Sequence, residues 1–218
     1  MLHLPWNPLQ ERGDLPLYEV IDRAWRSAGR AYHDVEHLGE MLTRCSEVAR
    51  DVGWKQPTEV FLATLFHDAI YEPLAKDNEA KSAALARKHI AEDPRLAPVD
   101  VDFVARLVEA TAGHGAHPPS TVDEDEGLFL DADMAILGAT PERYRRYVTD
   151  VRREYGVVPE EAFVAGRAAF VHKVLASASI YISPYFRARL EQVARANVAS
   201  ELTWLEGGAT PPWAMTAS

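Results

Sequence analysis

The sequence is poor in features that would place it outside the cell or in a membrane. It has one cysteine, Cys45, in 218 residues, so no disulfide can form within the chain. No apolar run approaches the roughly 20 residues that a membrane-spanning helix needs, and no basic segment followed by an apolar stretch and a cleavage site stands near the start. These absences predict a cytoplasmic protein that does not enter the membrane.

Positive charge is also scarce, since the formal net charge is −10. Nucleic-acid backbones and anionic membranes attract proteins through clustered Lys and Arg, so neither is an expected partner. A small anionic substrate remains compatible with this charge, because a metal cation inside a pocket can reverse the local field. No pattern in the sequence indicates an oligomeric state.

Helical periodicity dominates what is present, and alternating apolar and polar runs are few. Leu38, Leu42 and Cys45 belong to an apolar stripe with spacings of three and four, which predicts a helix over 34–52. A nearly all-apolar segment, VFLATLF, follows Pro57 and predicts a central helix that ends at His67-Asp68. Further helices are expected at 77–92, 99–112, 128–137, 141–155, 159–179 and 184–205.

The expected fold class is therefore all-α, a single-domain helical bundle over residues 1–206. With 47% hydrophobic residues the chain can bury one substantial core. The acidic run 123–126 (DEDE) is interpreted as a solvated loop. Residues 207–218, with Gly-Gly and Pro-Pro, are interpreted as a mobile tail.

Two histidines, His33 and His37, are four residues apart. On a helix that begins near residue 32 they would project from one face, one turn apart, and could reach one site. The alternative is that both are ordinary, partly exposed residues at a helix start. The pair therefore needs support from elsewhere in the sequence.

His67 and Asp68 supply part of that support, because they end a helix that is otherwise almost entirely apolar. An unpaired carboxylate is costly in such a place, so a cation should face Asp68. That cation could be an arginine, and backbone N–H groups could also satisfy Asp68. A metal ion would compensate both residues together.

A third acidic element lies in the apolar run 127–138 (GLFLDADMAILG), which contains Asp131 and Asp133. Residues two apart on a helix point about 200° away from each other, so both carboxylates are not expected on one ion. Asp131 can serve as the N-cap of a short helix, which favours Asp133 as the ligand. Asp131 stays open as the alternative.

Five short runs extend this pattern along the chain, and together they resemble a predicted-hydrolase branch of the HD superfamily of metal-dependent phosphohydrolases. The runs are Tyr32-His-Asp-Val-Glu-His37, Phe66-His-Asp-Ala-Ile-Tyr71, Asp77-Asn-Glu79 with Ser82-Ala83, Asp131-Ala-Asp-Met-Ala-Ile-Leu-Gly138 and Arg153-Glu-Tyr155. The resemblance covers roughly residues 6–205. It implies metal ligation by His37, His67, Asp68 and Asp133.

The resemblance also implies catalytic roles. Cyclic-nucleotide phosphodiesterases carry a similar His-x-x-x-His, in which the first His donates a proton to the leaving oxygen, and by that likeness His33 is the general acid. Asp68 is expected to orient the attacking water as well as to bind metal. Glu72, directly after the His67 run, is a candidate base or water-positioning group at the mouth of the pocket, although a solvated carboxylate is the simpler account.

Three further residues are candidates for substrate binding. Asn78 and Glu79 match a pair in the resembling branch; without that likeness they are the first turn of a helix capped by Asp77. His114 stands between two glycines, where backbone can approach a ligand. An exposed loop histidine is the alternative for His114.

The expected function is hydrolysis of a phosphoester or phosphoanhydride in a small phosphorylated molecule, with a nucleotide among the candidates. One divalent metal ion is expected: manganese, iron, cobalt, nickel or zinc suits two imidazoles and two carboxylates, and magnesium is a further candidate. One alternative is an iron-dependent oxygenase on the same scaffold. Another is a binding module in which a metal only holds the helices together.

Overall fold

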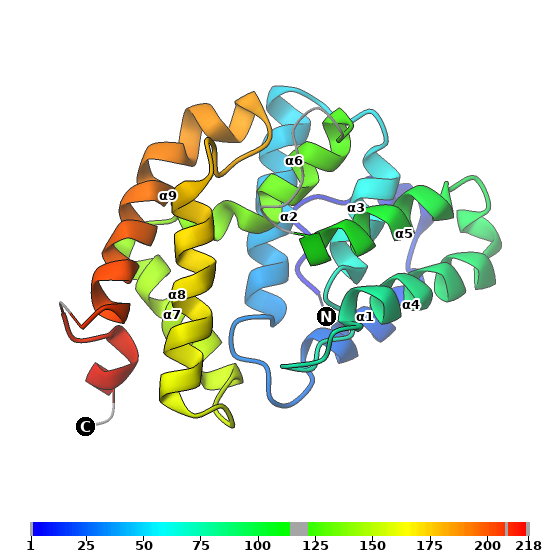
Figure 1. Ribbon diagram of the computed structural model, residues 1–218. Coiled ribbons are helices and arrows are strands. Elements are labelled where there is room, and N and C mark those ends of the chain that lie inside the picture. Colours follow the sequence, from blue (N-terminus) through cyan, green and yellow to red (C-terminus); the bar gives the residue numbers. More distant parts are fainter. Residues whose placement is uncertain (1, 114–121, 208, 217–218) are drawn as a thin grey trace.

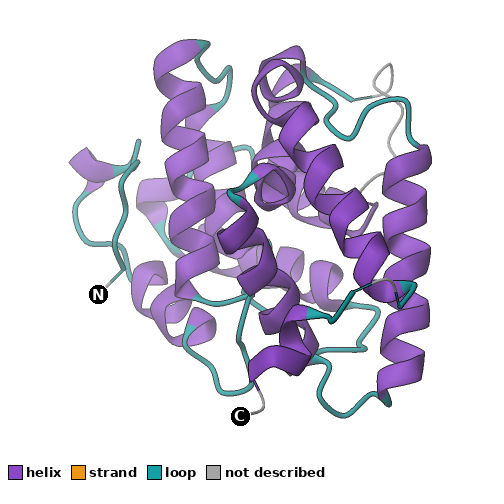
Figure 2. Ribbon diagram, turned by 90° about the vertical axis from the view of Figure 1, so that its left-hand side faces the viewer, coloured by secondary structure: helices purple, strands orange, loops and turns teal. Residues whose placement is uncertain are grey.

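The computed structural model describes residues 2–113, 122–207 and 209–216, and this part of the chain is built from helices and loops without a strand (Figures 1 and 2). The prediction of an all-α fold is therefore confirmed. Nine α-helices occur in these ranges: α1 (Leu17–Trp25), α2 (Val35–Asp51), α3 (Pro57–Phe66), α4 (Asn78–Glu92), α5 (Val101–Ala110), α6 (Glu124–Asp133), α7 (Pro141–Glu154), α8 (Glu160–Ala176) and α9 (Pro184–Leu205).

Helices α2 and α3 begin where the sequence signals predict. Asp34 is the N-cap of α2, and its side chain accepts hydrogen bonds from the backbone N–H groups of Glu36 and His37. Pro57 occupies the first position of α3, where its missing N–H costs no hydrogen bond. Every residue from Val60 to Phe66 is buried, so α3 runs through the centre of the molecule.

The acidic run 123–126 is not the solvated loop that its charge suggested. Asp123 is the N-cap of α6, and its side chain accepts the N–H of Glu126. Asp125 is only 2% exposed, and its carboxylate accepts the N–H groups of Lys55 and Gln56 at 3.1 and 2.7 Å. The carboxylates thus satisfy N–H groups at the starts of α6 and α3, where negative charge is favourable.

The segment expected as one helix over 128–137 also differs. Helix α6 ends at Asp133, and a 3-10 turn, Met134–Gly138, continues the chain. This turn packs closely on α9, because a Cβ placed on Gly138 would lie 2.7 Å from Leu190 Cβ. Gly138 is therefore required by the close approach of these two elements.

The structure adds an element that the sequence patterns did not indicate, and it places part of the C-terminal segment. Helix α1 buries Trp25 completely, and the indole N–H donates to the backbone oxygen of Leu65 at 2.9 Å. Near the other end, Pro212–Thr216 forms a 3-10 turn. There Trp213 packs edge-on against Phe163 of α8, with ring centroids 5.7 Å apart.

One continuous apolar core joins these elements. In Figure 1, α2, α3 and α6 occupy the middle of the molecule, with the α8–α9 pair on one side and the α4–α5 pair on the other. No helix in the described ranges has the length and apolar character to span a bilayer. Three of the predicted metal ligands belong to these central elements: His37 lies in α2, His67 directly follows α3, and Asp133 ends α6.

Candidate metal centre

Three of the predicted ligands meet in the middle of the fold. His37 lies in the first turn of α2, His67 directly follows α3, and Asp133 is the last residue of α6. Their donor atoms lie within 4.8 Å of one another. The two Nε2 atoms are 3.2 Å apart, and Asp133 Oδ1 lies 3.1 Å from His37 Nε2 and 3.7 Å from His67 Nε2.

This geometry fits one divalent metal ion. Metal–ligand bonds to imidazole nitrogen and carboxylate oxygen measure about 2.0–2.2 Å, which places neighbouring donor atoms about 3.0–3.5 Å apart around a tetrahedral or octahedral ion. The observed separations of 3.1–3.7 Å lie close to that range. Without a cation, two imidazole nitrogens at 3.2 Å can share only one proton. The group could therefore hold a metal.

Asp68, the fourth predicted ligand, stands beside this group. Its Oδ2 lies 3.3 Å from His67 Nε2. Burial disfavours the charged carboxylate, but His67 opposes this and lowers the pKa of Asp68 to about 2. An ionised carboxylate therefore faces the histidines, as a cation-binding site requires. Direct ligation by Asp68 stays a prediction.

His67 is oriented by its other ring nitrogen. Nδ1 lies 2.9 Å from the backbone oxygen of Thr64, and a carbonyl only accepts, so Nδ1 carries the proton and Nε2 is turned toward the site. Burial disfavours a charged imidazole, yet Asp68 and Asp133 outweigh it and raise the pKa of His67 to about 9. In the metal-free chain, the proton on His67 therefore supplies the positive charge that the two carboxylates favour.

Asp131 is neither the N-cap nor the metal ligand that the sequence allows. It is fully helical near the end of α6, so it is not an N-cap, and its side chain points to the start of α9. The carboxylate accepts the backbone N–H groups of Ile182 and Ser183 at 2.7 and 2.6 Å. Burial raises its pKa to about 6. Asp133, and not Asp131, lies with the histidines.

The sequence spacing predicts that His33 and His37 share a helix, and the structure shows that they do not. Helix α2 begins at Val35, so His33 lies in the turn before it. The two rings nevertheless come within 5.9 Å, centroid to centroid. His33 Nδ1 lies 2.7 Å from Glu154 Oε2, which directs the other nitrogen away from Glu154.

Glu154, at the end of α7, is a site residue to which sequence reasoning gave no role. Its Oε1 accepts the consecutive backbone N–H groups of residues 31–33 at 2.8–2.9 Å, and its Oε2 accepts the Tyr71 hydroxyl at 2.9 Å. Burial works against the charged form, but the His33 hydrogen bond and these N–H groups lower the pKa of Glu154 to about 2. The Arg153-Glu-Tyr155 run was the available signal.

Arg30 was missed altogether, and it ties the His33 turn to the turn that carries Asp68. Its Nη1 donates to the backbone oxygen of His33 at 2.6 Å. Its Nη2 donates to the backbone oxygens of Asp68 and Ala69 at 2.9 and 3.0 Å. All these acceptors are main-chain atoms, so no side-chain pattern pointed to Arg30.

A cavity of about 280 Å³ opens beside the ligands. Glu72 is exposed at its wall, and Glu79 is half-buried there. The Asn78 side chain exchanges two hydrogen bonds with the backbone of Glu72, at 3.1 and 2.9 Å, so it also shapes this wall. His114 lies outside the described residues. The predicted residues that line the cavity are His33, Asp68, Glu72, Asn78, Glu79 and Asp133.

Comparisons with known proteins identify no relative of this chain. The chain matches no protein-family model, no curated protein and no solved structure.

Proposed function

We propose that the chain is a metal-dependent phosphohydrolase that uses one divalent ion held by His37, His67 and Asp133, with Asp68 as the fourth ligand. One observation carries the proposal: Asp133 of the donor cluster lines the same cavity as Asp68 and as His33, whose ring is hydrogen-bonded to Glu154. A cation site next to a protonatable imidazole is the combination that hydrolysis of a phosphate ester requires. The resemblance to the HD superfamily supports the same reaction.

Each residue in the cavity has a defined task in this proposal. A bound divalent ion would lower the pKa of water and polarise a phosphoryl oxygen. The ionised Asp68 accepts a hydrogen bond from the attacking water and so orients it. His33 donates a proton to the leaving oxygen, while Glu154 accepts a hydrogen bond from Nδ1–H and stabilises the charged ring. Arg30 fixes the distance between the turns that carry Asp68 and His33.

The size of the cavity supports a small molecule as the phosphorylated substrate. A volume of about 280 Å³ is at the small end of the roughly 300–1,000 Å³ usual for ligand pockets. A nucleotide is a candidate, because Tyr71, Tyr155 and Phe170 offer aromatic surface in the wall.

The proposed location is the cytoplasm. A single buried cysteine, which has no partner for a disulfide within the chain, fits that setting.

The first test combines metal analysis with a hydrolysis screen. Purified wild type, Asp68→Asn and Asp102→Asn are analysed for bound metal and assayed on nucleotides, sugar phosphates and aryl phosphates. We expect a divalent metal in the wild type and a loss of at least about 100-fold in kcat/KM for Asp68→Asn. Asp102 is 82% exposed and pairs with Arg87, so its variant should be fully active.

The screen also separates the proposal from its alternatives. Absence of turnover in metal-loaded wild type across the panel would contradict a phosphohydrolase. Retained metal together with metal-dependent stability would then favour a module in which the ion only joins the helices. Bound iron with visible absorption on oxidation would favour an oxygenase.

A second test addresses the role of His33 as proton donor. Proton donation matters most when the leaving oxygen is a strong base, so His33→Gln should slow hydrolysis of alkyl phosphates by about 100-fold or more. Hydrolysis of p-nitrophenyl phosphate, whose leaving group needs no proton, should fall much less. Equal losses on both substrates would remove His33 from this role and leave it as a binding residue.

A further inference from the structure

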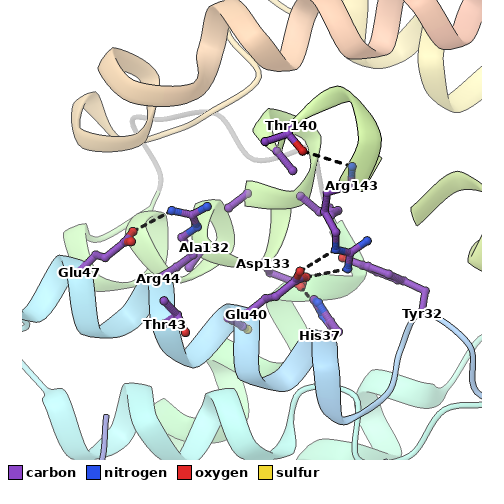
Figure 3. A pocket seen from close by; sticks show the side chains of 14 residues that line it. Tyr32, His37, Glu40, Thr43, Arg44, Glu47, Ala132, Asp133, Thr140 and Arg143 are labelled. Carbon is purple, nitrogen blue, oxygen red and sulfur yellow. Dashed lines mark hydrogen bonds and ion pairs between the residues drawn. The ribbon is translucent and has the colours of Figure 1, made fainter. Parts of the chain in front are cut away.

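A second chamber, of about 300 Å³, borders the metal ligands from the side of α2 and α7. It shares Tyr32 and Asp133 with the cavity described above, but its other polar walls come from α2 and the start of α7. Figure 3 shows this chamber with His37 and Asp133 at one end and the Arg44–Glu47 pair at the other. The proposed reaction assigns no task to it.

Two buried atoms in this chamber lack hydrogen-bond partners. In the described ranges, Tyr32 Oη and Arg143 Nη1 are the buried side-chain nitrogen and oxygen atoms for which none is found, and both residues line the chamber. Tyr32 is only 5% exposed, so bulk water does not satisfy its hydroxyl. Because buried polar atoms are nearly always hydrogen-bonded, two unpartnered atoms in one chamber point to a group that can bind there.

The unused hydrogen-bonding capacity of the chamber is of donor type. Glu40 already accepts Arg143 Nε and Nη2 at 2.6 and 2.7 Å, as Figure 3 shows. Glu47 accepts Arg44 Nη1 at 2.9 Å, and Asp133 lies 3.1 Å from His37. The carboxylates in the wall are thus partnered, whereas the Tyr32 hydroxyl and an Arg143 N–H are not. A ligand that fits must bring acceptor oxygens.

We propose that this chamber binds a small oxyanion, a phosphate or carboxylate group, which accepts hydrogen bonds from Tyr32 Oη and Arg143 Nη1. Arg44 stands at the far wall in an ion pair with Glu47. The chamber is small by the standard of ligand pockets, which suits an anion of a few heavy atoms. Binding here does not depend on hydrolysis, so the inference stands or falls separately from the proposed reaction.

The test uses the metal-loaded protein and two probes, inorganic phosphate and acetate, with affinities measured by calorimetry. Tyr32→Phe removes the unpartnered hydroxyl and should weaken binding of the preferred probe about tenfold, because a hydrogen bond to an anion is lost. Without a probe, the variant should melt at the same temperature or higher, since a buried unpaired hydroxyl is removed. Tyr18→Phe, whose hydroxyl lies far from the chamber near Asn7, should bind like wild type.

Location is tested separately, because phosphate can also bind a metal. Crystals of the metal-loaded protein, grown without phosphate or carboxylate and soaked in the preferred probe, should show the anion within hydrogen-bond distance of Tyr32 Oη and Arg143 Nη1. Arg44→Gln should weaken binding, and Arg87→Gln, an exposed control, should not. Density at the metal alone, water alone in the chamber, or unchanged affinity in Tyr32→Phe would each overturn the inference.

Discussion

At the scale of single residues, Glu154 organises the proton donor of the proposed site. One carboxylate oxygen collects three consecutive backbone N–H groups, and the other faces His33 Nδ1 and the Tyr71 hydroxyl. Such a carboxylate fixes both the position of the turn and the tautomer of the imidazole. Glu154 acts through His33, so it is a positioning residue and not a catalytic one.

Glu154→Gln should therefore lower kcat without releasing the metal. The amide keeps the size of the side chain but cannot balance a charged imidazole, and loss of such a partner typically costs 10–100-fold. The loss should be larger on alkyl phosphates than on p-nitrophenyl phosphate, because Glu154 acts through the proton donor His33. Glu142→Gln, 76% exposed on the same helix, is the control. Equal losses on the two substrates would show that Glu154 only supports the turn.

The lowered pKa of Glu154 predicts that the free energy of unfolding depends on pH. Folding lowers the pKa of Glu154 from 4.5 to about 2, so its contribution is complete above pH 4.5 and is lost as the pH falls toward 2. The shift corresponds to about 3 kcal/mol as an upper bound. In urea unfolding of metal-free protein, the deficit of Glu154→Gln should be largest near pH 6 and shrink by pH 3. A constant deficit would contradict this account.

The site residues that could be predicted have a signal in the local sequence. His67 and Asp133 interrupt apolar runs, and His37 stands four residues after His33, so each is visible in a short window of sequence. Glu154 lies 121 residues from His33, and its partners are mostly backbone N–H groups. Contacts of that kind leave no local signature.

At the scale of elements, the close approach of α9 to the turn after α6 depends on Gly138. Gly138→Ala would place a Cβ 2.7 Å from Leu190 Cβ and 3.0 Å from Tyr181 Oη, so the two elements must separate. We expect a loss of about 1–3 kcal/mol in the free energy of unfolding, measured by urea denaturation. Asp133 precedes this turn, so metal affinity should fall as well.

Gly39→Ala is the matched control for that substitution. Gly39 lies inside α2, and a Cβ there would meet no heavy atom within 4 Å. Because Ala is the better helix former, this variant should gain about 0.5–1 kcal/mol. A neutral effect of Gly138→Ala would mean that α9 can shift without cost, which the contacts around Leu190 contradict.

Periodicity predicts the helices from α2 to α9 but not α1, and the start of α6 depends on tertiary partners. The apolar segment of α3 is buried throughout, as its composition predicts. The start of α6 was misread because Asp125 looks solvated in sequence, yet it accepts N–H groups 69 and 70 residues away. A carboxylate near a helix N-terminus can either be solvated or accept backbone N–H groups that lack a partner in the helix. The sequence alone does not separate these two cases.

At the scale of the whole molecule, the candidate site joins three helices that are distant in sequence. His37 comes from the start of α2, His67 from the end of α3 and Asp133 from the end of α6. Together with Asp68, they place two carboxylates and two imidazoles beside the apolar core. A bound cation would balance these carboxylates and hold the three helix ends together, so metal binding and global stability should be linked.

Removal of the metal should therefore lower Tm. An ion present at 100 times its Kd adds about 2.7 kcal/mol to the stability of the folded state. For a chain of this size each kcal/mol shifts Tm by about 2–4 °C, so EDTA should lower it by roughly 5–10 °C in differential scanning calorimetry. Asp133→Asn should melt at one temperature with or without EDTA, because the site no longer holds the ion. An unchanged Tm in wild type, after elemental analysis has shown the metal to be gone, would mean that the helix ends need no cation and that His67 keeps its proton instead.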